Sequence, residues 1–221
     1  MRAVVFDMDG TLLDSVSTVS RAYADAIRSL GGPQVTPDEV VAGWHVGHTE
    51  LVLAHFLGRA CGPAGVERFH AYLDPAVAGL RPFPGIPALL DDLSDAGLRL
   101  GVFTAATRRV AASMLAAAGI DTRFEVVVAG DEVDRPKPAP DGLVLAARRL
   151  GVPAEATAYV GDAEVDLGCA RAAGARGVHA AWGARAGVRA GTHLVAARPD
   201  ALVPLLVPPG RHTAGPVHTT G

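Results

Sequence analysis

Several features are scarce in this sequence of 221 residues, and each absence limits what the protein can be. Two cysteines, Cys61 and Cys169, are too few for a disulfide framework, which is typical of a reducing compartment. No apolar run approaches the roughly 18 residues of a transmembrane helix, and the charged Asp7 comes too early for a signal peptide. The formal net charge of -3 supplies no basic field for nucleic acid. We therefore expect a soluble, cytoplasmic protein with neither a nucleic-acid nor a membrane partner.

Asparagine is absent, and Lys137 is the only lysine among 20 basic residues. Hydrophobic residues make up 49% of the chain and charged residues 19%, which excludes a disordered or fibrous protein and provides for a sizeable core. Because the bias from lysine towards arginine looks global, the one lysine that escapes it is a candidate for a specific role.

Short apolar segments alternate with segments of helical spacing along most of the chain. This alternation predicts an α/β protein with a doubly wound, Rossmann-like parallel sheet and helices on both of its faces. In such sheets the ligand lies beyond the carboxyl ends of the strands. The predicted strands are residues 2–8, 98–104, 124–129, 157–160, 176–180 and 193–196, and the predicted helices are residues 87–96, 107–118, 140–150, 164–173 and 199–206.

One long stretch, from residue 15 to about residue 80, has a helical pattern throughout. We expect roughly four short helices there, with breaks near residues 31–33, 46–47 and 62–63. The sequence thus predicts an all-helical cap domain, residues 15–81, inserted into a core domain made of residues 1–14 and 82–207. Residues 208–221 have little to bury and are expected to form a flexible tail.

Two carboxylates stand at the end of the first predicted strand, in the segment Asp7-Met8-Asp9-Gly10-Thr11. Asp and Gly also favour turns, so this segment alone fits a simple turn equally well. In the functional interpretation Asp7 is a nucleophile or metal ligand and Asp9 is a general acid and base.

Two further segments that follow predicted strands suit a phosphate group. Thr104 and Ala105 lie just before a predicted helix, where a hydroxyl and backbone amides form a natural phosphate site, although an isolated threonine more often only caps the helix. Lys137 stands between Pro136 and Pro138, which fix the backbone around it. Its point charge suits a phosphate or an anionic intermediate.

A second pair of carboxylates, Asp162 and Asp166, lies four residues apart where a strand passes into a helix. Acidic residues are ordinary in a first helical turn, for reasons of the helix dipole alone. Beside Asp7 and Asp9 on a neighbouring strand end, however, Asp162 would complete an all-oxygen site of the kind that Mg²⁺ prefers.

With these four segments in this order, the sequence resembles the haloacid dehalogenase superfamily, in the phosphatase branch that carries a helical cap after the first strand. That branch includes phosphoglycolate phosphatases and β-phosphoglucomutase, and the resemblance covers residues 1 to about 207. It implies that Asp7 attacks phosphorus to form an aspartyl phosphate, and that Asp9 protonates the leaving group and then activates water. Thr104 and Lys137 would hold the transferring phosphoryl group.

The same resemblance implies a Mg²⁺ cofactor, bound by Asp7, the backbone carbonyl of Asp9 and Asp162, with Asp166 in support. It also implies a small phosphate monoester as substrate and hinges near residues 14–15 and 81–82. One position departs from the common pattern, because Ala105 stands where the family often has asparagine. Its backbone amide can still bind phosphate, but a side-chain contact is missing.

The residues bear on four alternatives to a phosphatase. Asp9 argues against a dehalogenase, since halide departure needs no general acid, and the absence of lysine from residues 15–81 excludes a phosphonatase of the Schiff-base type. A β-phosphoglucomutase-like mutase uses the same aspartyl phosphate and stays open. A catalytically idle phosphoester-binding protein is disfavoured because Asp7, Asp9 and Lys137 are all present.

Substrate choice is expected to come from the cap, where Trp44, His45 and His48 are candidate contacts with the leaving group. The competing interpretation is that Trp44 packs within the cap and the two histidines are solvated. The natural substrate cannot be read from the residues, and no adhesive face is evident, so we expect a monomer or a weak homo-oligomer.

Overall fold

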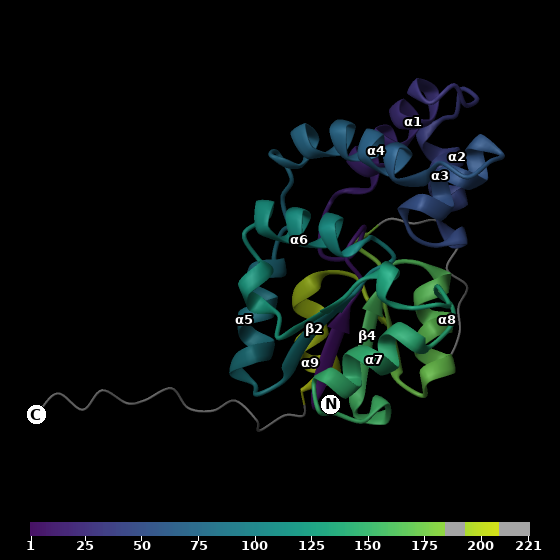
Figure 1. Cartoon of the computed structure of the whole chain (residues 1–221). Helices are drawn as coiled ribbons and strands as arrows, with labels where there is room; N and C mark the ends of the chain where they lie inside the picture. The colour runs from purple at the N-terminus through teal and green to yellow at the C-terminus, as the bar shows by residue number, and fades with distance from the viewer. Residues whose placement is uncertain (184–192, 208–221) are drawn as a thin grey trace, which may run out of the picture.

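The computed structural model describes residues 1–183 and 193–207 (Figure 1). Its sheet has six parallel strands in the order β3-β2-β1-β4-β5-β6. This is the strand order of Rossmann-type sheets, and it confirms the predicted fold class. The strands are β1 (Ala3–Phe6), β2 (Arg99–Phe103), β3 (Val126–Val128), β4 (Thr157–Gly161), β5 (Arg176–Ala180) and β6 (Leu194–Ala196).

The central strand β1 is buried on both faces, as its unbroken apolar sequence predicts. Val4 and Phe6 join a core cluster with α5 (Ile86–Asp95), α6 (Arg108–Ala117) and α9 (Leu202–Leu206). Ala3 and Val5 point to the other face and pack with α7 (Asp141–Arg149) and α8 (Glu164–Ala173). The alternation of side chains along a strand therefore builds two separate apolar layers around one sheet.

Helices fill the chain between β1 and α5. They are α1 (Val16–Ser29), α2 (Pro37–Gly43), α3 (Thr49–Leu57) and α4 (Gly62–Val77), with a 3-10 turn, η1 (Trp44–Val46), between α2 and α3. In Figure 1 this helical layer lies above the end of the sheet towards which the β4 arrow points, the end where a ligand is expected. That it forms a separate cap domain with the predicted boundaries stays a proposal.

An aromatic contact joins two helices of the helical layer, and a capping box stabilises the start of a third. The rings of Tyr23 on α1 and Phe69 on α4 stack with centroids 4.1 Å apart. Helix α2 begins with a capping box between Thr36 and Glu39. The break predicted at residues 62–63 lies a few residues too late, because α3 ends at Leu57 and Pro63 stands in the first turn of α4, where its missing N–H costs nothing.

The two connections between the sheet and the helical layer run side by side. The backbone N–H of Phe83 donates to the carbonyl of Leu12 at 3.0 Å, and Asp14 donates in the same way to Arg81 at 3.4 Å. Leu13 and Pro82 form an isolated antiparallel bridge between these bonds. Motion of the helices relative to the sheet would have to occur at this paired crossing.

The remaining elements agree with the sequence pattern apart from their ends. Short 3-10 turns, η2 (Asp121–Arg123), η3 (Gly130–Glu132), η4 (Ala154–Ala156) and η5 (Pro199–Ala201), join the longer elements, and η5 opens the helix predicted at 199–206. Both cysteines are free thiols. Across the two described ranges, each helix is too short or too polar to cross a membrane. The tail predicted at residues 208–221 lies outside the described residues.

Candidate active site

Asp7 stands directly after β1, and its backbone N–H continues the sheet by donating to the carbonyl of Val160 at 2.8 Å. Its carboxylate is buried and accepts a 2.6 Å hydrogen bond from the Nζ of Lys137. The same ammonium donates to Asp166 Oδ1 at 2.8 Å. The single lysine of the sequence, buried itself, thus bridges two carboxylates that come from different elements.

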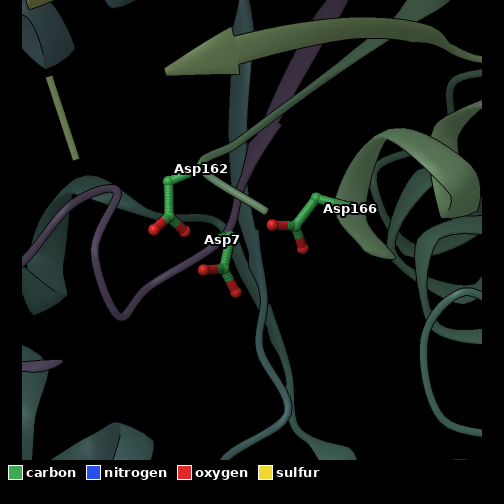
Figure 2. Close-up of side chains that lie close together, drawn as sticks. All are labelled: Asp7, Asp162 and Asp166. Atoms are coloured by element: carbon green, nitrogen blue, oxygen red, sulfur yellow. The ribbon is translucent and has the colours of Figure 1, made fainter. Parts of the chain in front are cut away.

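Three buried carboxylates, Asp7, Asp162 and Asp166, point towards one another in Figure 2. One oxygen from each can be chosen so that all lie within 4.8 Å of one another. Asp7 follows β1, Asp162 follows β4, and Asp166 belongs to the first turn of α8. Neighbouring parallel strands end at the same edge of the sheet, which is why residues 155 positions apart in sequence meet here.

Two glycines make room for this cluster. Gly10 has a positive φ of 83°, and a Cβ added there would lie 2.4 Å from Asp162 Oδ2. A Cβ at Gly161 would lie 2.4 Å from the Cβ of Asp166. The backbone can therefore approach the carboxylates closely only because these positions carry no side chain.

Asp166 combines a structural contact with its place in the cluster. Its Oδ2 accepts from the backbone N–H of Ala163 at 3.0 Å, which caps the start of α8. Its Oδ1 accepts from Lys137 and lies 3.3 Å from the hydroxyl of Tyr159, whose shorter hydrogen bond, of 2.9 Å, goes to the carbonyl of Phe103. This one side chain therefore caps α8, as is ordinary for an acidic residue in a first helical turn, and also belongs to the carboxylate cluster.

Burial sets the electrostatics of the cluster. Desolvation raises the pKa of Asp7 to about 8, against the opposing attraction of the Lys137 ammonium. Burial would lower the pKa of Lys137, but the charges of Asp166 and Asp7 outweigh it and raise that pKa above its ordinary value. Three carboxylates thus face one ammonium away from water, and a hard divalent cation is the group that such an all-oxygen set accommodates best.

Asp9 lies at the edge of this buried cluster and is half-buried. Its Oδ1 accepts a 2.5 Å hydrogen bond from the hydroxyl of Ser15, a fully buried side chain at the start of the helical layer. The carboxyl group that the sequence predicts to move protons is thus oriented by a residue from the first connection.

Thr104 and Ala105 follow β2, at the carboxyl end of the next strand. The buried Thr104 hydroxyl accepts from the backbone N–H of Ala106 at 3.1 Å. Thr107, by contrast, is the N-cap of α6 and accepts from the N–H of Val110. The capping role that was considered for Thr104 therefore belongs to Thr107.

A cavity of about 170 Å³ opens above these side chains, between the sheet and the helical layer. Its lining includes Asp7, Asp9, Thr104, Ala105 and Lys137 on the sheet side. The helical layer contributes Trp44 and the exposed His45 to the same cavity, whereas His48 lines an adjoining cavity of about 50 Å³ together with Lys137. Every site residue predicted from the sequence except Asp162 and His48 therefore lines this one space, and Asp162 lies in the carboxylate cluster beside it.

Sequence reasoning missed four contacts around the site. They are the bond of Ser15 to Asp9, the hydroxyl of Tyr159 on Asp166, the Thr11 hydroxyl on Asp162 at 3.4 Å, and the indole N–H of Trp182 on the Thr11 carbonyl at 2.9 Å. Only Tyr159 carried a signal, because a tyrosine in an otherwise apolar buried strand needs a partner for its hydroxyl.

Known proteins resemble this chain in sequence and in structure. Residues 1–174 match the family model for haloacid dehalogenase-like hydrolases. A phosphoglycolate phosphatase of Xanthomonas campestris is 34% identical over 192 residues, which cover 84% of this chain and 86% of that protein. The N-acetylmuramic acid 6-phosphate phosphatase of Pseudomonas aeruginosa is 32% identical over 181 residues, 80% of each chain.

Among solved structures, CbbY from Rhodobacter sphaeroides in complex with phosphate superposes with a TM-score of 0.82 at 26% identity. The match covers 92% of this chain and 96% of CbbY. The family model, the relatives and the fold agree, and the chain belongs to the haloacid dehalogenase-like hydrolases, as a phosphoric monoester hydrolase of that family.

Proposed function

We propose that this protein is a Mg²⁺-dependent phosphatase that hydrolyses a small phosphate monoester through an aspartyl phosphate on Asp7. The observation that carries the proposal is the buried carboxylate of Asp7 on the wall of a cavity, bound to Lys137 and clustered with Asp162 and Asp166. A carboxylate nucleophile divides one difficult displacement into two easier ones.

In the first step a carboxylate oxygen of Asp7 attacks phosphorus, and the bond between phosphorus and the leaving-group oxygen breaks. Asp9, in its protonated form, gives its proton to that oxygen, so the alcohol leaves neutral. In the second step Asp9 takes a proton from water, which attacks phosphorus and breaks the bond to Asp7. Inorganic phosphate leaves, and both carboxyl groups return to their starting states.

Charge is the main obstacle to the first step, because the Asp7 carboxylate and the phosphate are both anions. The Lys137 ammonium, already within hydrogen-bond distance of Asp7, offsets that repulsion at the reacting oxygen. The Thr104 hydroxyl and the Ala105 backbone N–H would hold the other phosphoryl oxygens, since both groups line the cavity ahead of α6.

The residues present fit a magnesium ion. The carboxylates of Asp7 and Asp162 and the backbone carbonyl of Asp9 would hold it, with Asp166 in support. When bound, the ion would supply positive charge that stabilises the transferring phosphoryl group. The cluster supports this proposal, since its three buried carboxylates lie around a single lysine.

The helical layer would close over the cavity when substrate binds and exclude water, with the paired connections near residues 14–15 and 81–82 as hinges. Trp44 and His45, which line the cavity from that layer, would contact the leaving group. Phosphoglycolate, for which the relative from Xanthomonas campestris is named, is one ester to be tested.

Phosphate release from a panel of phosphate monoesters, with and without Mg²⁺, tests the proposal. We expect release that requires Mg²⁺ and disappears in Asp7→Asn. The control is Asp121→Asn, a change at an exposed carboxylate that is not among the residues lining the cavity, and it is expected to behave as wild type. No release from any ester would contradict a phosphatase. Conversion of a hexose 1-phosphate in the presence of a bisphosphate primer, without net phosphate release, would indicate the mutase instead.

A further inference from the structure

A second, smaller cavity of about 40 Å³ adjoins the main one. Four residues line both cavities, namely Asp9, Trp44, Gly47 and Ala105. Gly47 and Ala105 are the two smallest of these, one from the helical layer and one from the sheet, and they stand where the spaces meet. The second cavity therefore borders the first at Asp9, and we call it the extension.

Most of the walls of this extension are hydrocarbon. They include Val19 and Tyr23 of α1, Val52 of α3, Phe69 of α4 and Val110 of α6. All five side chains are buried. An uncharged carbon skeleton can replace water in such a space favourably, whereas a hydroxyl or carboxylate would lose its hydrogen bonds to water.

The polar groups in this wall already bind one another. The hydroxyl of Tyr23 donates to the Oγ1 of Thr49 at 3.1 Å. Burial raises the pKa of Tyr23 above its ordinary value, so the phenol stays a neutral donor. The Tyr23 hydroxyl thus already has a hydrogen-bond acceptor within the protein.

The position of the extension beside Asp9 relates it to the alcohol part of the substrate, if the proposed function holds. Asp9 is the group that would protonate the leaving-group oxygen. Because Asp9 also lines the extension, the carbon atoms attached to that oxygen would enter the space between α1, α4 and α6. The phosphoryl group itself would stay in the main cavity beside Asp7 and Lys137.

We propose that the natural substrate is the phosphate monoester of a small, uncharged alcohol whose carbon skeleton carries few polar groups. The extension holds about three groups of the size of a water molecule, which limits the buried part to a few carbon atoms. Neither a carboxylate, as in phosphoglycolate, nor a polyhydroxy chain matches its walls.

Two isosteric pairs of esters test this assignment. Isobutyl phosphate has the shape of phosphoglycolate with the two carboxylate oxygens replaced by methyl groups, and 2-methylbutyl phosphate is glycerol 1-phosphate with its two hydroxyl groups replaced by methyl groups. We expect the hydrocarbon ester of each pair to have the higher kcat/KM, by about 10-fold or more. An equal or lower kcat/KM for the hydrocarbon esters would overturn the inference.

The panel separates failure of the inference from failure of the proposed function. Methyl phosphate is too short to fill the extension and reports on the phosphatase chemistry alone. If no ester in the panel, methyl phosphate included, is hydrolysed with Mg²⁺, the proposed function is wrong. If methyl phosphate is hydrolysed but the hydrocarbon member of each pair has no advantage, only the substrate assignment is wrong.

Changes of size at Val110 give an independent test of where the alcohol lies. Val110→Ile fills part of the extension and is expected to lower the ratio of kcat/KM for isobutyl phosphate to that for methyl phosphate about 10-fold. Val110→Ala enlarges the space and is expected to favour cyclohexyl phosphate over isobutyl phosphate relative to wild type.

Val77 of α4 is a matched control, a valine of similar burial in the same core cluster. Val77→Ile and Val77→Ala are expected to leave both ratios at their wild-type values. Equal changes of these kcat/KM ratios in the Val77 and Val110 variants would contradict the placement of the alcohol beside Val110. Unchanged ratios in the variants of both residues would contradict it as well.

Discussion

Lys137 shows how much one side chain can determine in a site of like charges. Its ammonium lies between Asp7 and Asp166, and it also lies 4.9 Å from the centroid of the Phe103 ring. A cation held by two carboxylates and an aromatic face has few alternative positions, so it is preorganised before substrate binds.

Replacing Lys137 by methionine keeps much of the volume and removes the charge. We expect kcat to fall about 10²- to 10³-fold, because the repulsion between Asp7 and the phosphate is no longer offset. The matched control is Arg135→Met, which removes an exposed cation from the same loop and is expected to keep near wild-type kcat. Steady-state kinetics on one ester measure kcat for both variants. Similar losses of kcat in Lys137→Met and Arg135→Met would contradict the role of Lys137.

Ser15 is a positioning residue, because it acts on substrate only through Asp9. Ser15→Ala is expected to lower kcat about 10-fold for an alkyl phosphate, whose leaving group needs the proton of a well-oriented acid. For p-nitrophenyl phosphate, whose leaving group departs without protonation, we expect a much smaller loss. Ser17→Ala, a change at an exposed serine on the same helix, is the control. An equal loss on both esters would show that Ser15 has only a structural role.

Among the elements, the turn after β1 has little freedom to change. Gly10 combines a positive φ with an approach to Asp162 that leaves no room for a Cβ. The turn also holds Thr11, whose hydroxyl donates to Asp162 and whose carbonyl accepts from the Trp182 indole. One short turn therefore connects three strand ends.

Gly10→Ala and Gly31→Ala form a matched pair for this turn. Both glycines have positive φ, 83° and 78°, but only a Cβ at Gly10 would meet another atom, since the space at Gly31 is open. We expect Gly31→Ala to cost about 1–2 kcal/mol of unfolding free energy and to keep activity. Gly10→Ala is expected to cost more and to reduce Mg²⁺ affinity at least 10-fold. Chemical denaturation and Mg²⁺ titration measure both, and equal effects of the two changes would contradict the account.

The elements were largely predictable, because their signals are local. Strands β1, β2 and β4 are short, largely apolar runs that end at a glycine or just before a polar residue, and Gly119 and Gly151 follow the ends of their helices with positive φ as expected. The helix ends between α3 and α4 were less predictable, since a Gly-Pro pair marks the start of a helix as readily as a break.

At the scale of the molecule, the strand order explains why the sequence alone could predict that motifs far apart in the chain form one site. The order β3-β2-β1-β4-β5-β6 puts the ends of β2, β1 and β4 side by side, so Thr104, Asp7 and Asp162 meet without any information on packing. The contacts of Ser15 and Trp182, and the hydrocarbon walls of the smaller cavity, depend on how the helices pack on one another and on the sheet. No periodicity in the sequence encodes those positions.

The burial of Asp7 also gives the whole molecule a pH dependence that Mg²⁺ should reverse. The pKa of Asp7 in the folded, metal-free protein is about 8, above the ordinary value of about 3.9, so the folded state holds this proton more tightly than the unfolded state. The resulting stability is fully present below about pH 3.9 and is lost as the pH rises through about 8.

We therefore expect the Tm of the metal-free protein to fall between pH 6 and pH 8.5, and saturating Mg²⁺ to raise it most at the upper end of this range. Binding of Mg²⁺ at pH 7 should release a proton, measurable by calorimetry in two buffers of different ionisation enthalpy. Asp7→Asn should remove both the Tm slope and the proton release. A wild-type slope equal to that of Asp7→Asn would contradict this assignment.

The covalent intermediate is the central claim, and trapping it is the most direct measurement. Borohydride added during turnover reduces an acyl phosphate to an alcohol, so an aspartyl phosphate at position 7 becomes homoserine. We predict homoserine at position 7 in peptide mass spectra of wild-type enzyme quenched with substrate and Mg²⁺, and none without substrate or in Asp7→Asn. Active enzyme whose Asp7 stays unmodified while another carboxylate is reduced would contradict the account.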